Sequence, residues 1–332
     1  MSIAVRSFAK INLGLKIGPA RADGFHELRT IYQTLALHDV VRVEVQPGSG
    51  IEIRCNDPRV PLDESNTCYQ AAERVLRAAK ASAKVIVQID KRLPVQGGLG
   101  AGSSNAVATM LGLERALETK IPAAAKMRIA TEIGSDVPLF LIGGTVLGIG
   151  HGEEVYPLQD LPRMHLVVVT PPISVSTPKA FAQWDKLVAR EAALTGAGAA
   201  GTINKFSQAV DAWLSQSVLP RVVSADGPAS GVPAVGGDRA ETPLLDLVRA
   251  GIENDFERVV FPEYPDLREV KRVLEREGAR YASLSGSGST VYGLFPSGEE
   301  AQAAARMCAL GHAAVATTTL TREEYWKAVA SG

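Results

Sequence analysis

The part of the sequence with the clearest chemical potential is a glycine-rich run between an expected strand and an expected helix. It reads Leu93-Pro94-Val95-Gln96-Gly97-Gly98-Leu99-Gly100-Ala101-Gly102-Ser103-Ser104-Asn105. Glycines let the backbone approach a ligand closely and adopt positive φ. The first N–H groups of the following helix have no partner within the helix, and the helix dipole favours negative charge there. The run therefore predicts a phosphate-binding loop, with the hydroxyls of Ser103 and Ser104 as further donors.

Spacing excludes two better-known phosphate loops. A Walker A loop ends in Gly-Lys-Ser/Thr, and this run contains no lysine. A dinucleotide fingerprint needs GxGxxG, whereas Gly98 to Gly102 reads GxGxG and is one residue short. Taken alone, the run could also be a loop of purely structural glycines. A second cluster, Ser285-Gly286-Ser287-Gly288-Ser289-Thr290, is typical of a hairpin turn. Whether it also belongs to a functional site depends on which part of the molecule it contacts.

The first half of the chain must position the glycine-rich run. Apolar residues that alternate with polar ones predict strands at 11–17 and 41–45, each with one buried face. The other elements expected here are a helix capped by Ser65-Asn66 and ending near Ala81, a strand at 84–90, helices at 103–118 and 122–133, and a strand pair near 140–158.

The second half predicts a different arrangement. Its expected elements are a strand at 165–170, helices around 178–190 and 266–277, strands at 280–285 and 290–295, a helix at 299–310 and a strand at 313–318. Strand, helix, strand, strand, helix, strand is the order of a ferredoxin-like domain. Thr321 and Glu324 predict a capping box for a last short helix. Residues 191–242 are rich in Gly, Ala and Pro, which predicts a surface insertion with a helix near 204–215.

Length and composition bound the class of protein. A chain of 332 residues predicts two domains, which we place at 1–160 and 161–332. Its 35 Lys and Arg balance 36 Asp and Glu, so no overall basic field favours nucleic acid or an anionic membrane. Three cysteines without a CxxC pair argue against a disulfide framework or a zinc ribbon, and they fit a reducing compartment.

No segment of the sequence predicts export or membrane insertion. The first fifteen residues are interrupted by Arg6, Lys10 and Asn12, so they lack the apolar core of a signal peptide. The most apolar stretch, Val137 to Gly150, is shorter than the about 20 residues that a spanning helix needs. We therefore expect a cytoplasmic protein with a small-molecule substrate and with neither a nucleic-acid nor a membrane partner, as a monomer or weak homodimer.

Three separated segments together resemble one family. They are Ala9-Lys10-Ile11-Asn12-Leu13 with Arg21-Ala22-Asp23-Gly24-Phe25-His26, Pro94 to Ala106, and Leu284 to Thr290. The Pro-x-x-x-Gly-Leu-x-x-Gly-Ser-Ser pattern resembles the GHMP small-molecule kinases. The AKIN…RADGFH opening narrows the resemblance to the 4-diphosphocytidyl-2-C-methyl-D-erythritol kinases of the non-mevalonate isoprenoid pathway. The resemblance covers nearly the whole chain except 191–242.

The resemblance implies an α+β, two-domain GHMP-kinase fold, with an N-terminal mixed α/β nucleotide-binding domain and a C-terminal ferredoxin-like domain. It implies transfer of the γ-phosphoryl group of ATP to the 2-hydroxyl of the methylerythritol unit, with Lys10 and Asp136 as the catalytic pair. The substrate-side positions are Asn12, Phe25, His26, Thr177 and Phe181. The ATP-side positions are Asn66, Lys91, Pro94, Val95, Gln96, Gly97, Gly98, Leu99, Gly100, Ala101, Gly102, Ser103 and Ser104. The chemistry implies Mg²⁺, for which no protein ligand is assigned, because this ion often keeps its waters and binds phosphates.

Each of the chemically important side chains also has an ordinary structural interpretation. Asp136 could cap a helix, and a strand lysine such as Lys10 normally points to solvent. His26 could be a turn histidine, and Phe25 and Phe181 could belong to the core. The resemblance instead makes Asp136 a general base and Lys10 its charge-stabilising partner. It makes His26 a reader of the cytosine edge and the two phenylalanines a base sandwich, since stacking contributes about 1–3 kcal/mol per base.

The chain departs from the family pattern at three positions. Phe25 replaces a more usual tyrosine, which keeps stacking but loses a phenol hydrogen bond. Gln96 and Ala101 stand where small residues or glycine are common, and Ala101 predicts an ordinary backbone conformation at that point.

Two other functions compete with this interpretation. Another GHMP kinase, for homoserine or mevalonate, is disfavoured by the Asp-Gly-Phe-His segment, since those substrates carry no cytosine. A catalytically silent nucleotide-binding regulator is disfavoured by the presence of both Lys10 and Asp136.

Overall fold

The computed structural model describes residues 2–95, 97–195 and 253–331, and two β-sheets organise them. The first sheet is built around a long antiparallel hairpin of β1 (Ser2–Ala20) and β2 (His26–Gln46). One end of β2 pairs with β4 and the other with β5, so the sheet runs β3-β4-β2-β5-β6 with β1 beside β2. The shorter strands are β3 (Gly50–Cys55), β4 (Lys84–Asp90), β5 (Thr145–Ile149) and β6 (Glu154–Pro157).

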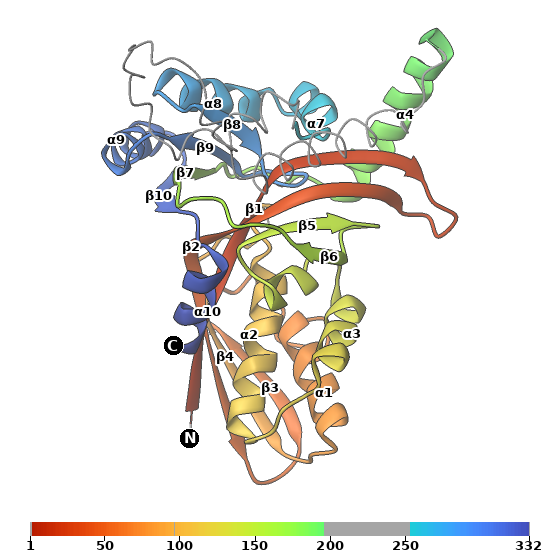
Figure 1. The fold of residues 1–332 in the computed structure, drawn as a ribbon, viewed down its shortest axis with the longest axis vertical. Helices are drawn as coiled ribbons and strands as arrows, with labels where there is room; N and C mark the ends of the chain where they lie inside the picture. Colours follow the sequence, from red (N-terminus) through yellow and green to blue (C-terminus); the bar gives the residue numbers. More distant parts are fainter. Residues whose placement is uncertain (1, 96, 196–252, 332) are drawn as a thin grey trace, which may run out of the picture.

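Helices cover one face of this first sheet (Figure 1). They are α1 (Thr67–Ala79), α2 (Ala101–Ala116), α3 (Ala123–Ile133) and the short 3-10 helix η1 (Pro138–Leu141). The expected helices are confirmed, with Asn66 capping α1 through the N–H of Cys68. α2 begins two residues earlier than expected, so the end of the glycine-rich run is helical. Met110 and Leu113 of α2 are fully buried against the sheet, which fixes the direction in which α2 leaves the loop.

The second sheet has the order β10-β7-β9-β8, and all its neighbouring strands are antiparallel. Its elements are β7 (His165–Thr170), α4 (Thr177–Thr195), α7 (Glu257–Glu263), α8 (Pro265–Arg276), β8 (Tyr281–Leu284), β9 (Val291–Phe295), α9 (Gly298–Cys308) and β10 (Ala313–Thr318). This is the ferredoxin-like order that the sequence predicts. The helix expected near 204–215 and the aperiodic stretch 224–242 lie outside the described residues.

The hairpin of β1 and β2 joins the two sheets, because β1 is buried on both faces from Phe8 to Ile17. Ile11 and Leu13 pack with Val168 and Tyr292 of the second sheet in a core between the sheets. The strand predicted at 11–17 is therefore confirmed as part of β1, but the expectation of a single buried face is wrong. Two of its polar side chains, Lys10 and Asn12, face a cavity within the protein, and Lys16 is buried in an ion pair with Asp255.

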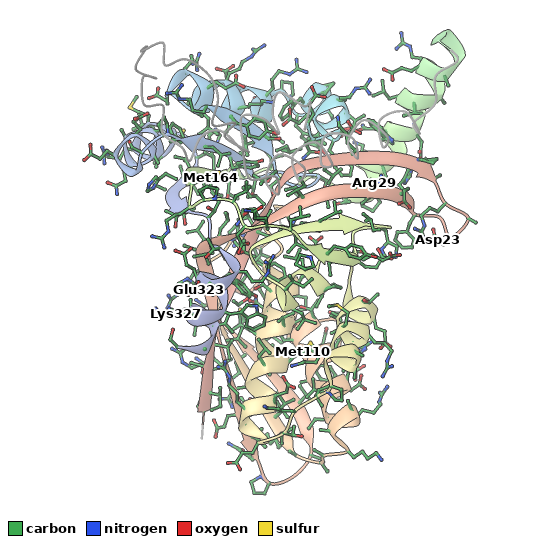
Figure 2. The ribbon with its side chains drawn as sticks, viewed as in Figure 1. Asp23, Arg29, Met110, Met164, Glu323 and Lys327 are labelled. Carbon is green, nitrogen blue, oxygen red and sulfur yellow. The ribbon has the colours of Figure 1, made fainter. Side chains whose placement is uncertain are left out.

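The last helix, α10 (Arg322–Ala330), returns to the first sheet. The predicted capping box between Thr321 and Glu324 is present. Tyr325 is buried in the first core, and its hydroxyl donates to the carbonyl of Phe140. Figure 2 shows Glu323 and Lys327 of α10 pointing away from this core. The C-terminus thus supports η1, the element that follows Asp136.

Candidate active site

The glycine-rich run forms a loop that leads directly into α2. Gly100 is the N-cap of α2, has a φ of +68° and provides no side-chain cap. The first helical hydrogen bond runs from the N–H of Ser104 to the carbonyl of Gly100. The N–H groups of the residues between them therefore have no acceptor within the helix and, with the helix dipole, suit a phosphate group. Ala101 has no positive φ, as its side chain predicts.

The second glycine cluster packs against this loop. The N–H of Thr290 donates to the carbonyl of Gly97 at 3.1 Å, and the hydroxyl of Ser285 donates to the carbonyl of Gly98 at 2.9 Å. A Cβ on Gly98 would lie 2.1 Å from the carbonyl oxygen of Ser285, and the φ of Gly98 is +85°. Only glycine fits there, so residues 285–290 are a wall of the site as well as a turn.

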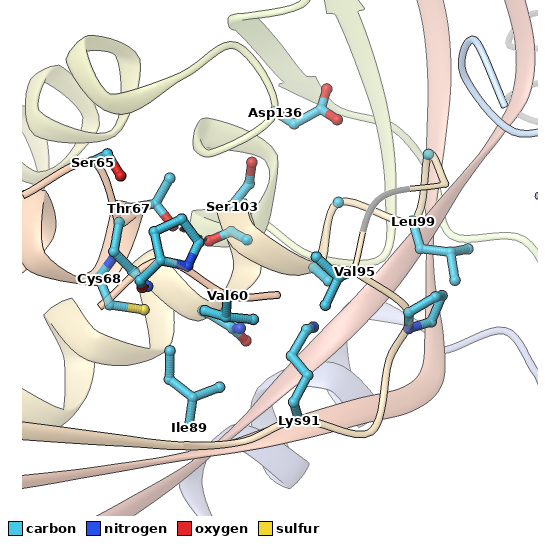
Figure 3. A pocket seen from close by; sticks show the side chains of 18 residues that line it. Val60, Ser65, Thr67, Cys68, Ile89, Lys91, Val95, Leu99, Ser103 and Asp136 are labelled. Carbon is cyan, nitrogen blue, oxygen red and sulfur yellow. Dashed lines mark hydrogen bonds between the residues drawn. The ribbon is translucent and has the colours of Figure 1, made fainter. Parts of the chain in front are cut away.

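A cavity of about 400 Å³ opens beside the loop, between the start of α1, the end of β4 and the start of α2. We call it the nucleotide cavity, because assigned ATP-side positions line it. Figure 3 shows Asp136 on one side of this cavity, with Lys91 and Ile89 on the opposite side. The assigned ATP-side residues that line it are Asn66, Lys91, Pro94, Val95, Gly98, Leu99, Gly100, Ala101, Gly102 and Ser103. Cys68 lines it too, and burial raises the pKa of the Cys68 thiol to about 12, so the thiol stays protonated.

Two of the assigned ATP-side residues lie elsewhere, and a third is not described. Gly97 borders the neighbouring cavity instead. Ser104 is buried behind the loop, where its hydroxyl accepts a hydrogen bond from that of Ser7 at 2.8 Å. The Ser104 hydroxyl therefore ties α2 to β1. Gln96 lies outside the described residues.

Lys91 lines the nucleotide cavity with its ammonium already paired. Its Nζ lies 2.6 Å from Oδ2 of Asp39, which is fully buried. The other oxygen of Asp39 accepts from the N–H groups of Arg92 and Leu93. Removing one partner of such a buried pair strands the other charge, which costs about 3–5 kcal/mol. Asp39 thus fixes the segment between β4 and the phosphate loop.

Asp136 and Lys10 meet where the nucleotide cavity adjoins a second cavity, which is described below. Lys10 Nζ lies 3.3 Å from Asp136 Oδ2 and donates to Asn12 Oδ1 at 2.8 Å. The Lys10 side chain is 3% exposed and that of Asp136 is 33% exposed. Asp136 lies between α3 and η1, and neither helix uses it as a cap. The structural alternatives for both residues are therefore wrong: the lysine is buried, and the carboxylate is free to contact a ligand.

Tyr32 completes this group from β2. Its hydroxyl donates to Asp136 Oδ1 at 3.0 Å, and Lys10 Nζ lies 5.4 Å from the centre of its ring. Burial, with the nearby Asp136 charge, raises the pKa of Tyr32 well above its usual value. Tyr32 consequently stays a neutral donor at physiological pH. The two oxygens of Asp136 are each oriented by a separate residue.

We call the second cavity, of about 760 Å³, the substrate cavity, because the positions assigned above to the substrate side line it. It lies between the hairpin of β1 and β2, the start of α4 and the second glycine cluster. All five residues assigned to the substrate side line it: Asn12, Phe25, His26, Thr177 and Phe181. Lys10 and Asp136 line it as well, and Asp136 thereby borders both cavities. Thr177 and Ser287 share a hydrogen bond of 2.7 Å, which ties α4 to the glycine cluster.

Aromatic side chains form the outer wall of the substrate cavity. The ring of His26 stacks on Phe181, with 4.8 Å between centres and an interplanar angle of 11°. Phe25 is 56% exposed at the end of the β1–β2 turn, and its ring lies 5.0 Å from that of His151. Phe25 and Phe181 are thus not paired with each other, and each presents part of its surface to the same cavity.

Four residues of the site have no signal in the sequence motifs. Tyr32 stands opposite Asn12 in the β1–β2 register, and this pairing alone could have indicated it. His151 lines the substrate cavity and lies 2.9 Å from Ser135 Oγ through Nδ1. Asn254 donates to the carbonyls of Leu284 and Gly286, which fixes the second glycine cluster. Asp185 reaches His26 from α4.

Comparison with known proteins defines the class. Residues 66–144 match the GHMP kinases N terminal domain, and residues 241–313 match the GHMP kinases C terminal domain. A homoserine kinase crystal structure from Cytophaga hutchinsonii, 19% identical, superposes with a TM-score of 0.69 over 96% of this chain and 95% of that one, which supports the fold alone. The fold and the phosphate loop together define a GHMP kinase, and kinases of this class use ATP as co-substrate.

Closer relatives narrow the class. The 4-diphosphocytidyl-2-C-methyl-D-erythritol kinase of Solibacter usitatus is 36% identical over 88% of this chain and 80% of its own length. That of Acaryochloris marina is 33% identical over 89% and 87%. A crystal structure of 4-(cytidine 5'-diphospho)-2C-methyl-D-erythritol kinase, 29% identical, gives a TM-score of 0.69 over 96% of this chain and 99% of that chain. The chain belongs to the 4-diphosphocytidyl-2-C-methyl-D-erythritol kinase family.

Proposed function

We propose that this protein transfers the γ-phosphoryl group of ATP to the 2-hydroxyl of 4-diphosphocytidyl-2-C-methyl-D-erythritol in the non-mevalonate isoprenoid pathway. One observation carries the proposal. The Asp136 carboxylate borders the nucleotide cavity and the substrate cavity at once, with Lys10 Nζ 3.3 Å from it. A hydroxyl in one cavity and a γ-phosphate at the loop can meet only where the cavities adjoin, and the ionisable pair lies there.

In the proposed reaction Asp136 is the general base. The substrate hydroxyl oxygen forms a bond to the γ-phosphorus, the bond from that phosphorus to the bridging oxygen breaks, and ADP leaves. The hydroxyl proton moves to an oxygen of Asp136. Tyr32 and Lys10 hold the two carboxylate oxygens, so the base is oriented before the substrate arrives.

Lys10 is the proposed charge-stabilising partner. Its ammonium is buried, and its partners on the protein are Asp136 and Asn12. An ammonium has three N–H donors, so a third remains for the incoming hydroxyl or a γ-phosphate oxygen. Negative charge that develops between these oxygens in the transition state is stabilised by the same cation.

The loop amides bind the phosphates, and we include Mg²⁺ in the proposal. The described residues contain no group of three or more His, Cys, Asp or Glu side chains that could hold a metal. Mg²⁺ often uses one or two carboxylates together with substrate phosphates, and the carboxylate of Asp136 and the hydroxyl of Ser103 both face the nucleotide cavity. When bound, the ion would neutralise charge on the β- and γ-phosphates.

The environment of the enzyme also belongs to the proposal. Across the described ranges, no helix combines the length and the apolar character needed to cross a bilayer. We propose a cytoplasmic enzyme that binds no nucleic acid and exists as a monomer or weak homodimer.

The decisive experiment is ATP turnover by the purified full-length protein with a panel of alcohols. We expect turnover with the cytidyl substrate and none above background with homoserine or mevalonate. Preferential turnover of homoserine or mevalonate would replace the proposal with another GHMP kinase. ATP binding without turnover of any alcohol would favour a catalytically silent nucleotide-binding regulator.

A further inference from the structure

The carboxylate of Asp185, outside the substrate cavity, contacts His26, the residue that the family resemblance makes a reader of the cytosine base. His26 Nε2 lies 2.7 Å from Oδ1 of Asp185, which stands one helical turn after Phe181 on α4. The side chain of His26 is 8% exposed, whereas that of Asp185 is 55% exposed. His26 lines the substrate cavity and Asp185 does not. Any effect of Asp185 on the substrate therefore passes through His26.

This contact decides which imidazole nitrogen carries the proton. An ionised carboxylate accepts hydrogen bonds and cannot donate, so the proton of a neutral His26 must be on Nε2. Nδ1 is then an unprotonated acceptor. Among the described residues, none hydrogen-bonds to this Nδ1. It is therefore the imidazole nitrogen left for a ligand in the cavity.

An acceptor at Nδ1 distinguishes cytosine from uracil and thymine. Cytosine presents an N4 amino donor where uracil and thymine present the O4 acceptor. An unprotonated Nδ1 can accept a hydrogen bond from the amino group of cytosine. Opposite uracil or thymine, its lone pair would face the lone pairs of the O4 carbonyl oxygen, which is unfavourable. The stacking of His26 on Phe181, at 11°, adds a geometric condition. A base that hydrogen-bonds in the plane of the imidazole is also parallel to the Phe181 ring, so the two contacts are compatible.

We propose that Asp185 is a positioning residue for base selection: by holding the proton on Nε2 of His26, it leaves Nδ1 as the acceptor that prefers cytosine to uracil. The inference rests on the proposed function and goes further, because it identifies a residue outside the cavity that sets specificity. A carboxamide at position 185 can accept from Nε2–H or donate to bare Nε2. Asp185→Asn thus permits both tautomers, and Asp185→Glu retains an acceptor-only group.

The test compares kcat/KM of the full-length protein for the cytidyl substrate and for its uridine counterpart. The wild type should prefer the cytidine form. In Asp185→Asn this preference should fall by roughly tenfold, which corresponds to one hydrogen bond to a charged or polar partner. The change should appear in KM for the cytidyl substrate rather than in kcat, and KM for ATP should not change. Asp185→Glu should keep most of the preference. Asp266→Asn, on an exposed residue in the first turn of α8, is the matched control and should match the wild type.

The outcomes separate this inference from the proposed function. If the wild type uses neither substrate, the proposed function fails. If the wild type prefers cytidine and Asp185→Asn raises KM for both substrates equally, Asp185 only supports the fold of the site and the inference is overturned. Nitrogen NMR of labelled histidine gives a second measurement that needs no variant to fold. We expect the neutral His26 ring of the wild type in the Nε2–H form; an Nδ1–H form would overturn the inference.

Discussion

The nucleotide side and the substrate side of the site are built by different means. On the nucleotide side, the phosphate loop and the first turn of α2 offer backbone N–H groups, and backbone contacts such as that between Gly97 and Thr290 hold the loop. On the substrate side, the contacts come from side chains on β1, β2, α4 and the second glycine cluster. The glycine-rich loop and the first turn of α2 are one contiguous stretch of chain, whereas the substrate side is an assembly of distant segments.

This difference predicts how each side responds to substitution. A backbone site is sensitive to any Cβ that changes the path of the chain, whereas it is insensitive to the chemistry of most side chains. A side-chain site is sensitive to single functional groups, and each loss should affect one ligand. Asp136, whose side chain borders both cavities, should behave like neither, because its loss affects the reaction rather than the binding of either ligand.

The largest effect is expected from Asp136→Asn, since this carboxylate borders both cavities. The variant keeps the shape of the side chain but removes the base, so kcat should fall by about 10²–10⁴-fold. ATP affinity should stay within a few-fold, because the loop amides bind the phosphates. Steady-state kinetics with ATP titration by calorimetry would measure both. A variant that retains most of the wild-type kcat would show that Asp136 is not the base.

The next largest effect tests the backbone nature of the nucleotide side. In Gly98→Ala the new Cβ meets the Ser285 carbonyl at 2.1 Å, and the residue must also keep a φ of +85°. Strain of about 1–3 kcal/mol at such a position should weaken ATP binding between about tenfold and about a hundredfold. Gly311→Ala is the control, because a Cβ there meets nothing within 4 Å and the φ is not in the left-handed region. Equal ATP affinity in the two variants would contradict a loop fixed by its close packing.

The same contrast explains what the sequence could predict. The glycine-rich loop before α2, the α1 cap at Asn66 and the capping box at Thr321 and Glu324 are each local in sequence, and the structure contains all three. The ferredoxin-like order was also visible, because each of its elements has its own periodicity. Local patterns suffice where the physical cause lies within a few residues.

Contacts between distant segments could not be predicted in this way. The burial of Lys10 depends on the second sheet covering the other face of β1, so the usual exposure of a strand lysine gives the wrong expectation. Ser104 has the same residue type as Ser103 but lies on the buried side of α2, which only the packing on Ser7 decides. Asp39 and Asp185 contribute to the site through residues far from them in sequence.

A smaller and more selective effect is expected on the substrate side. His26→Ala should raise KM for the cytidyl substrate by roughly tenfold, the loss expected for one hydrogen bond and part of a stacked surface. KM for ATP should not change, because His26 borders only the substrate cavity of the two. The measurement is a pair of titrations, each with the other substrate saturating. Equal weakening of both substrates would mean that His26 supports the whole site rather than the base.

The smallest effect should come from Tyr32→Phe, the variant that tests how closely the two sides are coupled through Asp136. Phenylalanine keeps the ring beneath Lys10 but removes the hydroxyl that donates to Asp136 Oδ1 at 3.0 Å. Since Lys10 still holds Oδ2, the base stays in place, and kcat should fall by only about fivefold, the equivalent of about 1 kcal/mol. The raised pKa of Tyr32 keeps its hydroxyl protonated through the physiological range, so the ratio of the wild-type kcat to the variant kcat should stay constant across that range. Steady-state kinetics of both proteins as a function of pH would measure this ratio. A kcat equal to that of the wild type would mean that Tyr32 only packs beneath Lys10, and the two oxygens of Asp136 would then not be held independently.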